Sequence, residues 1–266
     1  MASLPHLLRI NAASCLGFGA VFLSAPGTVS ALLGSVPQQV LVVIGAGLLI
    51  NGLHLSMASM RAAPRPAEII WFSLGDLLWW ASSLAVVASA RWITTSFGIV
   101  SVLLVALAVA ALGLAQLAVL GMARSGLSGT DHWRRIGQSW LSLPGWVKVW
   151  LFVLNLAFLA APVFLSWTDG HVVLLAYAAT GPLLLGFALY EGGMSRIMGV
   201  GHLLPWVPLL GWLGFRWAEA GPGSIGMGYL AGLAALIVLC LAFDVYDIIR
   251  WIRGERGLLI AAGGDT

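Results

Sequence analysis

Long apolar segments alternate with short polar stretches along the whole chain. A helix needs about 20 apolar residues to cross a bilayer, because every backbone amide must find its partner inside the segment. The segments of suitable length are residues 7–22, 40–58, 69–88, 97–120, 147–165, 172–190, 197–215 and 225–246. The pattern predicts an all-α integral membrane protein with eight transmembrane helices, and it leaves the conformation of residues 24–38 open.

Lysine and arginine are distributed unevenly between the two sides of these segments. One side carries Arg9, Arg61, Arg65, Arg124, Arg134, Arg135, Lys148, Arg196, Arg250, Arg253 and Arg256, and the other carries only Arg91 and Arg216. Cytoplasmic loops retain basic residues during insertion. The distribution therefore predicts that both termini are cytoplasmic, in the inner membrane of a bacterium.

The composition agrees with a lipid environment. Hydrophobic residues make up 60% of the chain and charged residues only 9%, whereas about a quarter of a soluble domain is charged. The net charge of +3 is explained by the basic cytoplasmic loops, so nucleic acid is not an expected partner. Cys15 and Cys240 both lie in apolar segments and are interpreted as small buried side chains, so no disulfide and no metal site is expected.

The longest polar stretch, residues 122–145, divides the chain into two halves. Its basic and aromatic residues favour an interfacial position, and we expect a membrane half at 1–121, a linker at 122–145, a second half at 146–250 and a cytoplasmic tail at 251–266. Gly75-Asp76-Leu77-Leu78-Trp79-Trp80 in the third segment resembles Gly201-His202-Leu203-Leu204-Pro205-Trp206 in the seventh. The match is short, so duplication and coincidence both stay open. A duplication would make two parallel four-helix repeats.

Polar side chains inside the segments lie at one depth. They are Asn51, His54, Asp76, Gln116, Asn155, His202 and Asp244. Each lies about 6 to 10 residues from the basic boundary, which is about 9 to 15 Å along a helix. Such groups are expensive in a bilayer and call for a partner, a cavity or a function. We expect Asp244 only to pair with Arg250 and Arg253, near the end of its helix.

Two of these polar groups, Asp76 and His202, support a specific hypothesis about function. Asp76 and His202 occupy equivalent positions in the two halves, so they are candidates for a pair that relays a proton. Pro205 and Pro208 interrupt the helix beside His202, as at many transporter sites. The predicted ligand-binding or proton-relay residues are Asp76, His202, His54, Asn51, Asn155, Gln116, Trp80 and Trp206.

Three classes of function remain open, because no catalytic motif is present and no catalytic residue can be assigned. The first is a protein that binds or carries a small ligand in a polar cavity on the cytoplasmic side, with coupling to protons. The second is a membrane enzyme with a lipid-soluble substrate, or a redox protein in which His54 and His202 bind a b-type haem. The third is an accessory subunit or homo-oligomer, packed through the GxxxG face of Gly228 and Gly232. For any single polar residue, a hydrogen bond that only holds two helices together is the simpler explanation.

Overall fold

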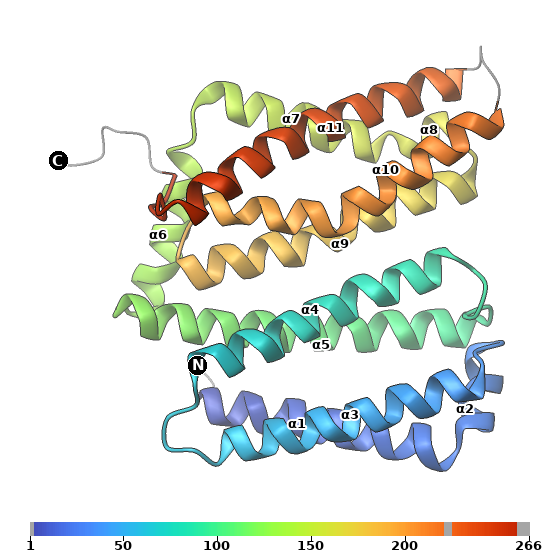
Figure 1. Cartoon of the computed structure of the whole chain (residues 1–266), viewed down its shortest axis with the longest axis vertical. Coiled ribbons are helices and arrows are strands. Elements are labelled where there is room, and N and C mark those ends of the chain that lie inside the picture. Colours follow the sequence, from blue (N-terminus) through green and yellow to red (C-terminus); the bar gives the residue numbers. More distant parts are fainter. Residues whose placement is uncertain (1–2, 221–224, 260–266) are drawn as a thin grey trace. The chain divides into compact units, whose positions relative to one another are not determined.

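The computed structural model describes residues 3–220 and 225–259, and α-helices make up most of that part of the chain (Figure 1). Contacts between residues divide the chain into two compact units, Met1–Ala123 and Arg124–Thr266, here called unit 1 and unit 2. Unit 1 contains α1 (Leu4–Ser24), α2 (Pro26–Leu33), α3 (Gln38–Ser59), α4 (Pro66–Ala88) and nearly all of α5 (Ser96–Ser125). Unit 2 contains α6 (Gly129–Leu141), α7 (Gly145–Leu159), α8 (Ala161–Phe164), α9 (Trp167–Glu191), the 3-10 turn η1 (Arg196–Gly199), α10 (Val200–Ala220) and α11 (Ile225–Ile252).

The length and composition of the helices identify a polytopic membrane protein. In the described residues, seven helical segments are long and apolar enough to cross a bilayer. An eighth is reached only if α6 and α7, which are bent by 91°, are counted together as one span. Many large apolar side chains are exposed, among them Val43 (71%), Ile50 (70%) and Phe152 (67%). In water these surfaces would be unfavourable, so they are surfaces for lipid. The count of eight stays a prediction.

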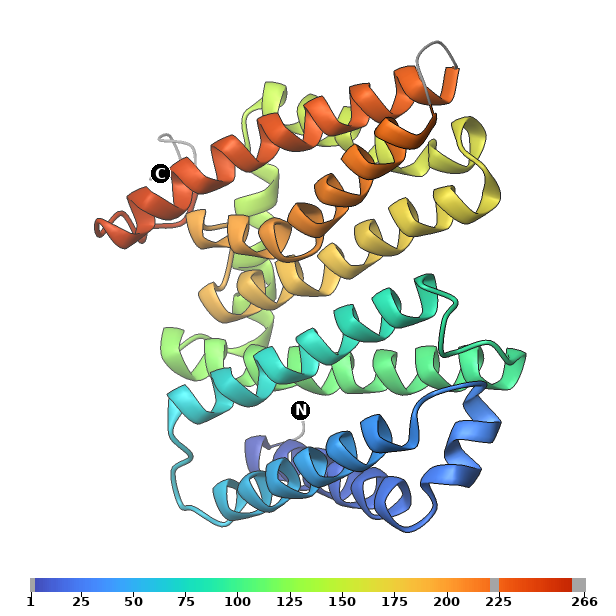
Figure 2. The ribbon, with the colours of Figure 1, turned by 45° about the vertical axis from the view of Figure 1, so that its right-hand side comes forward.

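Helices α1 and α3 lie side by side in unit 1 because small residues line their contact (Figures 1 and 2). A Cβ atom added at Gly19 would lie 2.9 Å from the carbonyl oxygen of Gly45. A Cβ added at Gly52 would lie 2.8 Å from Cγ of Leu16. The glycines have no side chain, so the two helices approach each other closely at these positions. Packing of this kind holds membrane helices together.

Residues 24–38, which the sequence pattern left open, contain the short helix α2. The helix begins at Pro26, whose fixed φ suits a first helical turn. After it, Ser35 donates its backbone N–H to the carbonyl of Trp92 at 2.9 Å. Gly34 has φ of 135°, and a Cβ there would lie 2.3 Å from Oγ1 of Thr94, so glycine is required. The end of α2 is therefore tied to the connection between α4 and α5.

In unit 2, helix α6 packs on the C-terminal end of α9. Arg135 donates from Nε to the carbonyl of Gly192 at 2.9 Å and from Nη2 to that of Glu191 at 3.1 Å. His132 Nε2 lies 2.9 Å from the carbonyl oxygen of Leu189. These are carbonyls that an α-helix leaves without an internal donor at its end. The residues predicted to form an interfacial linker thus include a helix that completes α9.

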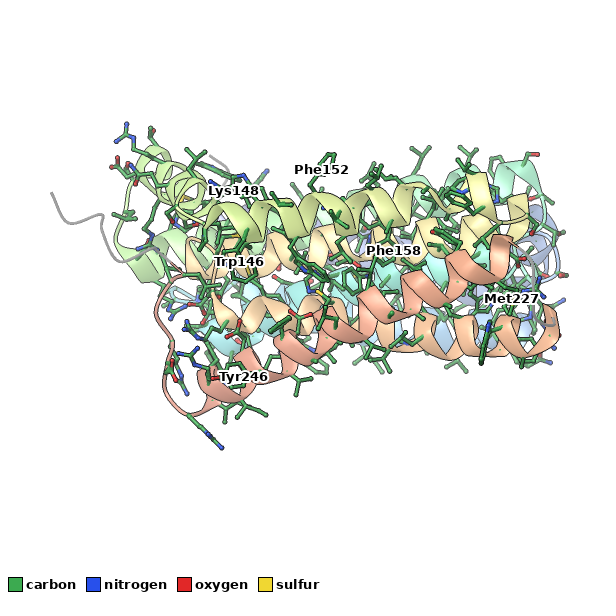
Figure 3. All side chains as sticks on the ribbon, turned by 90° about the horizontal axis from the view of Figure 1, so that it is seen from above. Trp146, Lys148, Phe152, Phe158, Met227 and Tyr246 are labelled. Atoms are coloured by element: carbon green, nitrogen blue, oxygen red, sulfur yellow. The ribbon has the colours of Figure 1, made fainter. Side chains whose placement is uncertain are left out.

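Aromatic rings form the centre of unit 2. Phe158 is fully buried, and its ring stacks on Trp206 at 5.0 Å and on Tyr177 at 5.2 Å between centroids. Phe152 lies on the same helix but points outward (Figure 3). The hydroxyl of Tyr229 donates to the carbonyl of Ala157 at 2.7 Å, which joins α11 to α7. One face of α7 therefore faces the protein and the opposite face is free for lipid.

The fifth predicted segment, 147–165, is not one continuous helix. It consists of α7 and the four-residue helix α8, which meet at Ala160. Pro162 has no N–H to donate to the carbonyl of Phe158 four residues earlier, which explains the break.

Candidate functional site

Asp76 of α4 lies at the centre of a hydrogen-bonded group in unit 1. Its Oδ2 accepts from Nδ2 of Asn11 on α1 at 2.8 Å and from Nε2 of Gln116 on α5 at 3.2 Å. Asp76 is only 5% exposed, and Asn11 and Gln116 are buried. Oδ1 of Asp76 accepts no hydrogen bond within the described part of the chain. One carboxylate oxygen is therefore held by two amides and the other is available to a further donor.

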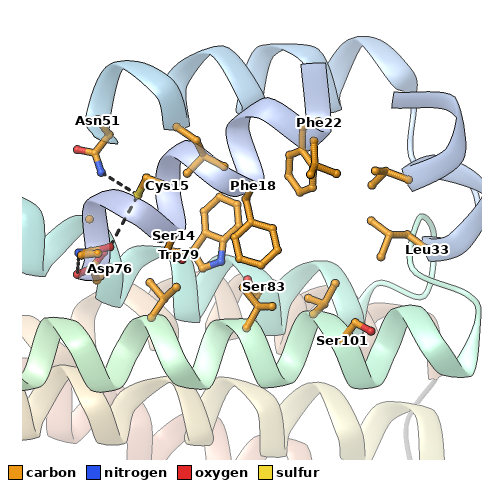
Figure 4. A pocket seen from close by; sticks show the side chains of 18 of the residues that line it. Ser14, Cys15, Phe18, Phe22, Leu33, Asn51, Asp76, Trp79, Ser83 and Ser101 are labelled. Atoms are coloured by element: carbon orange, nitrogen blue, oxygen red, sulfur yellow. Dashed lines mark hydrogen bonds between the residues drawn. The ribbon is translucent and has the colours of Figure 1, made fainter. Parts of the chain in front are cut away.

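Weaker sulfur contacts extend this group to α3 (Figure 4). Asn51 Nδ2 donates to Sγ of Cys15 at 3.6 Å, and Sγ of Cys15 lies 3.7 Å from Oδ1 of Asn11. Polar side chains from α1, α3, α4 and α5 therefore form a continuous network that ends at Asp76.

Glycine on α5 lets the helices approach closely enough for this network. A Cβ added at Gly113 would lie 2.9 Å from Cβ of Asp76 and 3.1 Å from the carbonyl oxygen of Ser73. Any larger residue at this position would push α5 away from α4. Gln116 lies three residues after Gly113, on the same face of α5, so the same approach brings its amide to Asp76.

A cavity of about 570 Å³ begins at this network. It is lined by Asn11, Ser14, Cys15, Phe18, Val21, Phe22, Val29, Leu32, Leu33, Leu48, Asn51, Trp71, Phe72, Gly75, Asp76, Trp79, Ser83, Phe97, Ser101, Val102, Val105 and Val109. Figure 4 shows Asp76 and Asn51 at one end, Phe18 and Phe22 along the wall, and Leu33 and Ser101 at the far end. The cavity is therefore largely apolar, with its strongest hydrogen-bonding groups gathered at one end.

The direction of the cavity differs from the sequence prediction. We expected a polar cavity on the cytoplasmic side, where Arg61 and Arg65 lie. From Asp76 the cavity extends the other way, toward α2 and the first turns of α5. The predicted cavity was based on polar residues alone, whereas most of the observed cavity wall is made of apolar side chains. The hydropathy pattern does not distinguish these side chains from those that face lipid.

His54, predicted as a site residue together with Asn51, belongs to a different group. Its Nε2 lies 3.4 Å from Oε1 of Glu68, which also pairs with Arg61. Its ring meets that of Phe72 edge-on, with centroids 4.8 Å apart. This group lies at the connection between α3 and α4, where it joins the ends of the two helices.

Trp80 and Asn155 also lie outside the network around Asp76. The indole nitrogen of Trp80 is buried without a partner, and its neighbour Trp79 lines the cavity instead. Asn155 donates to the carbonyl of Leu151 at 2.6 Å and accepts a hydrogen bond from Tyr177. Asn155 therefore links α7 to α9.

A second polar group in unit 2 contains His202. Nδ1 of His202 lies 2.9 Å from Oδ2 of Asp244, and its ring stacks on Trp206 with centroids 4.3 Å apart. The same carboxylate oxygen lies 3.7 Å from Sγ of Cys240. The prediction that Asp244 only pairs with arginines is wrong, since Arg250 is held by Glu255.

Asp76 and His202 therefore each have a partner within their own unit. The same is true of the two proposed haem ligands, because His54 contacts Glu68 and His202 contacts Asp244.

Sequence reasoning missed Asn11 and Cys15 as members of the first network and Cys240 as a member of the second. Asn11 could have been predicted as a member of the network, because a primary amide in the middle of an apolar segment needs a hydrogen-bond partner. The cysteines gave none, since a thiol is compatible with an apolar helix face. No protein-family model, curated protein or solved structure matches the chain.

Proposed function

We propose that unit 1 binds a lipid-soluble molecule whose hydrocarbon part fills the cavity and whose polar end donates a hydrogen bond to Asp76. The proposal rests on the position of a carboxylate, with one oxygen that accepts no hydrogen bond within the described residues, at the end of a largely apolar cavity. A volume of about 570 Å³ lies within the range of about 300 to 1,000 Å³ that is typical of small-molecule sites.

The network favours a ligand with a hydroxyl or amine group. The amides of Asn11 and Gln116 are both used to hold Oδ2, so they orient the carboxylate and leave Oδ1 to accept. A buried acceptor without a donor is costly, and a ligand that supplies the donor removes that cost.

Exposed side chains in the cavity wall point to entry from the membrane. Phe18 (38%), Val21 (48%), Leu32 (49%) and Phe97 (61%) line the cavity and are also exposed on unit 1. A wall of this kind is open between helices, so an apolar molecule reaches it without crossing water. This favours a lipid-soluble ligand over a water-soluble one.

We also propose that the two units are parallel repeats. In each unit a side chain of the third predicted helix contacts one of the fourth, Asp76 with Gln116 and His202 with Asp244, at separations of 40 and 42 residues. In unit 1 α1 is followed by the short helix α2, and in unit 2 α7 is followed by the short helix α8, and both short helices have proline in their first turn. A common ancestor for the two halves explains both similarities.

The test is the identity and amount of lipid-soluble material that the purified full chain retains. For the wild type we expect mass spectrometry of the material extracted from the purified protein to find about one lipid-soluble molecule per chain. Val105→Trp, which fills the cavity, is expected to lower this amount at least tenfold. Val100→Trp is the matched control, because Val100 is on the same helix, is 56% exposed and does not line the cavity.

Asp76→Asn tests the polar end of the site. It keeps the shape of the side chain but weakens its acceptor, so we expect the affinity to fall about tenfold. Equal retention by wild type and Val105→Trp, with both proteins folded by thermal unfolding in detergent, would show that the cavity is not the binding site. Absence of any retained or added lipid-soluble molecule from the wild type would reject the proposal.

A further inference from the structure

We propose that His202, Cys240 and Asp244 bind one divalent metal ion of the zinc type. Each residue offers one ligand atom, and the three atoms lie within 4.8 Å of one another. Nδ1 of His202 is 2.9 Å and Sγ of Cys240 is 3.7 Å from Oδ2 of Asp244. Metal–ligand distances of about 2.0 to 2.3 Å place the ligands of a tetrahedral ion about 3.3 to 3.8 Å apart. The three atoms are therefore already near the positions that an ion needs.

The charges of this ligand set suit an apolar environment. A divalent ion, one thiolate, one carboxylate and one neutral imidazole sum to zero net charge. Binding releases the thiol proton of Cys240 to water. The proton of the neutral imidazole moves from Nδ1, where it faces Asp244, to Nε2, so that Nδ1 coordinates the ion. A neutral assembly avoids the large penalty for a net charge among membrane-spanning helices.

The surroundings hold the ligands in place. Trp206 stacks on the imidazole of His202 with an interplanar angle of 23°, which fixes the plane of the ring. The 3-10 turn η1 packs tightly on α11 at Asp244, since a Cβ at Gly199 would lie 2.7 Å from Cβ of Asp244. Cys240 and Asp244 are four residues apart and therefore lie on one face of α11. Positioning by neighbours of this kind is what metal ligands require.

Three protein ligands leave a fourth position for water or another ligand. The side chains of His202 and Asp244 are 14% and 15% exposed, so the protein does not seal the group completely. Zinc sites with three protein ligands and one open position are typical of catalysis, whereas structural zinc sites have four protein ligands. A nucleophilic thiol activated by histidine is a poorer explanation, because the carboxylate of Asp244 is the group that contacts both the thiol and the imidazole.

Cobalt(II) tests the site, because thiolate coordination produces an intense charge-transfer absorption that nitrogen and oxygen ligands do not. The full chain, purified in detergent and freed of metal by a chelator, is titrated with Co²⁺ and then with Zn²⁺. We expect a thiolate band that saturates at about one equivalent of Co²⁺ and is displaced by Zn²⁺. Cys240→Ser should remove the band, and His202→Ala should weaken binding at least tenfold.

Cys15→Ser is the matched control, because Cys15 is also buried in an apolar helix but its thiol contacts the amides of Asn11 and Asn51 in unit 1. It should keep the band. A wild type without a thiolate band, or a band that survives in Cys240→Ser, would overturn the proposal. If Cys240→Ser fails to fold, X-ray absorption of the Zn²⁺-loaded wild type decides, since one sulfur ligand supports the site and a shell of nitrogen and oxygen alone rejects it. This site belongs to unit 2 and stands or falls independently of ligand binding in unit 1.

Discussion

Asp76 is stabilised by amides instead of by a cation. A charged side chain at the centre of a membrane helix costs about 2.5 to 3.5 kcal/mol on insertion scales. Asn11 and Gln116 each contribute a hydrogen bond to the same oxygen, and hydrogen bonds to a charged group contribute about 1.5 to 3 kcal/mol each. The two hydrogen bonds together reduce the cost of burying the carboxyl group. They involve only Oδ2, so Oδ1 stays available to a further donor.

His132 predicts a dependence of stability on pH. Its Nε2 donates to the carbonyl of Leu189, and its Nδ1 is buried with no hydrogen-bond partner in the described part of the chain. Burial, aided by the charge of Arg135, lowers the pKa of His132 below its ordinary value of 6.5, although the carbonyl of Leu189 acts against this. The folded state thus resists protonation. The neutral ring of His132 therefore contributes fully to the stability of the folded state above pH 6.5. This contribution is lost as the pH falls below that value.

The thermal midpoint of the full chain in detergent, measured between pH 8 and pH 5, checks this expectation. His132→Gln keeps a donor for Leu189 but does not titrate, so its midpoint should fall less at low pH than that of the wild type. His6→Gln should keep the wild-type profile, because His6 is exposed. Superimposable profiles for wild type and His132→Gln would contradict the assignment.

At the scale of the helices, glycine position decides packing. Gly45 lies against α1, where an added Cβ would meet Cβ of Phe22 at 3.0 Å, while an added Cβ at Gly47 would meet nothing within 4 Å. We therefore expect Gly45→Leu to destabilise unit 1 by about 1 to 3 kcal/mol through overpacking. Gly47→Leu on the same helix should have little effect. Thermal unfolding of both variants in detergent measures the difference, and equal midpoints would be inconsistent with the observed α1–α3 contact.

The GxxxG face predicted from the sequence does not contribute to packing within the described residues. A Cβ added at Gly228 or Gly232 would meet nothing within 4 Å, and both residues are exposed on α11. Close approach in unit 1 instead uses Gly19, Gly45 and Gly52. These glycines lie where α1 and α3 meet and do not form a four-residue motif along one helix. A sequence motif records spacing along one helix, but packing needs a partner opposite it.

At the scale of the whole molecule, α7 decides the topology. Among the residues that the structure describes, seven helical segments qualify as membrane spans without it, and α7 has only 15 residues before the break at Ala160. The distribution of basic residues predicts that α7 and α8 together cross the membrane, so that the C-terminus is cytoplasmic. A structure with seven spans would place the two termini on opposite sides.

Fusions to alkaline phosphatase, which is active only outside the cytoplasm, distinguish the two arrangements. We expect low activity for fusions after Trp140 and at the C-terminus, and high activity for fusions after Thr94 and Leu165. High activity at the C-terminus together with low activity after Leu165 would exclude a crossing by α7. A green fluorescent protein fusion at the C-terminus is the complementary control, because it fluoresces in the cytoplasm.

The apolar segments could be predicted from the sequence because insertion into lipid depends on local hydropathy and on the charges that flank each helix. The depth of Asn51, Asp76, Gln116 and His202 was predicted in the same way, since depth is counted along one helix. The break before Pro162 also has a local cause, the missing N–H of proline. The sequence pattern nevertheless predicted one continuous helix over residues 147–165.

Only the tertiary structure decided which polar groups meet. The partners of Asp76 are on α1 and α5, and the partner of His202 is on α11, because a contact depends on the rotation of each helix about its axis and on which helices are neighbours. A hydropathy pattern contains neither quantity. The cavity and the His202–Cys240–Asp244 group likewise arise from helices that are distant in sequence, so the apolar and thiol side chains that form them could not be distinguished from those that face lipid.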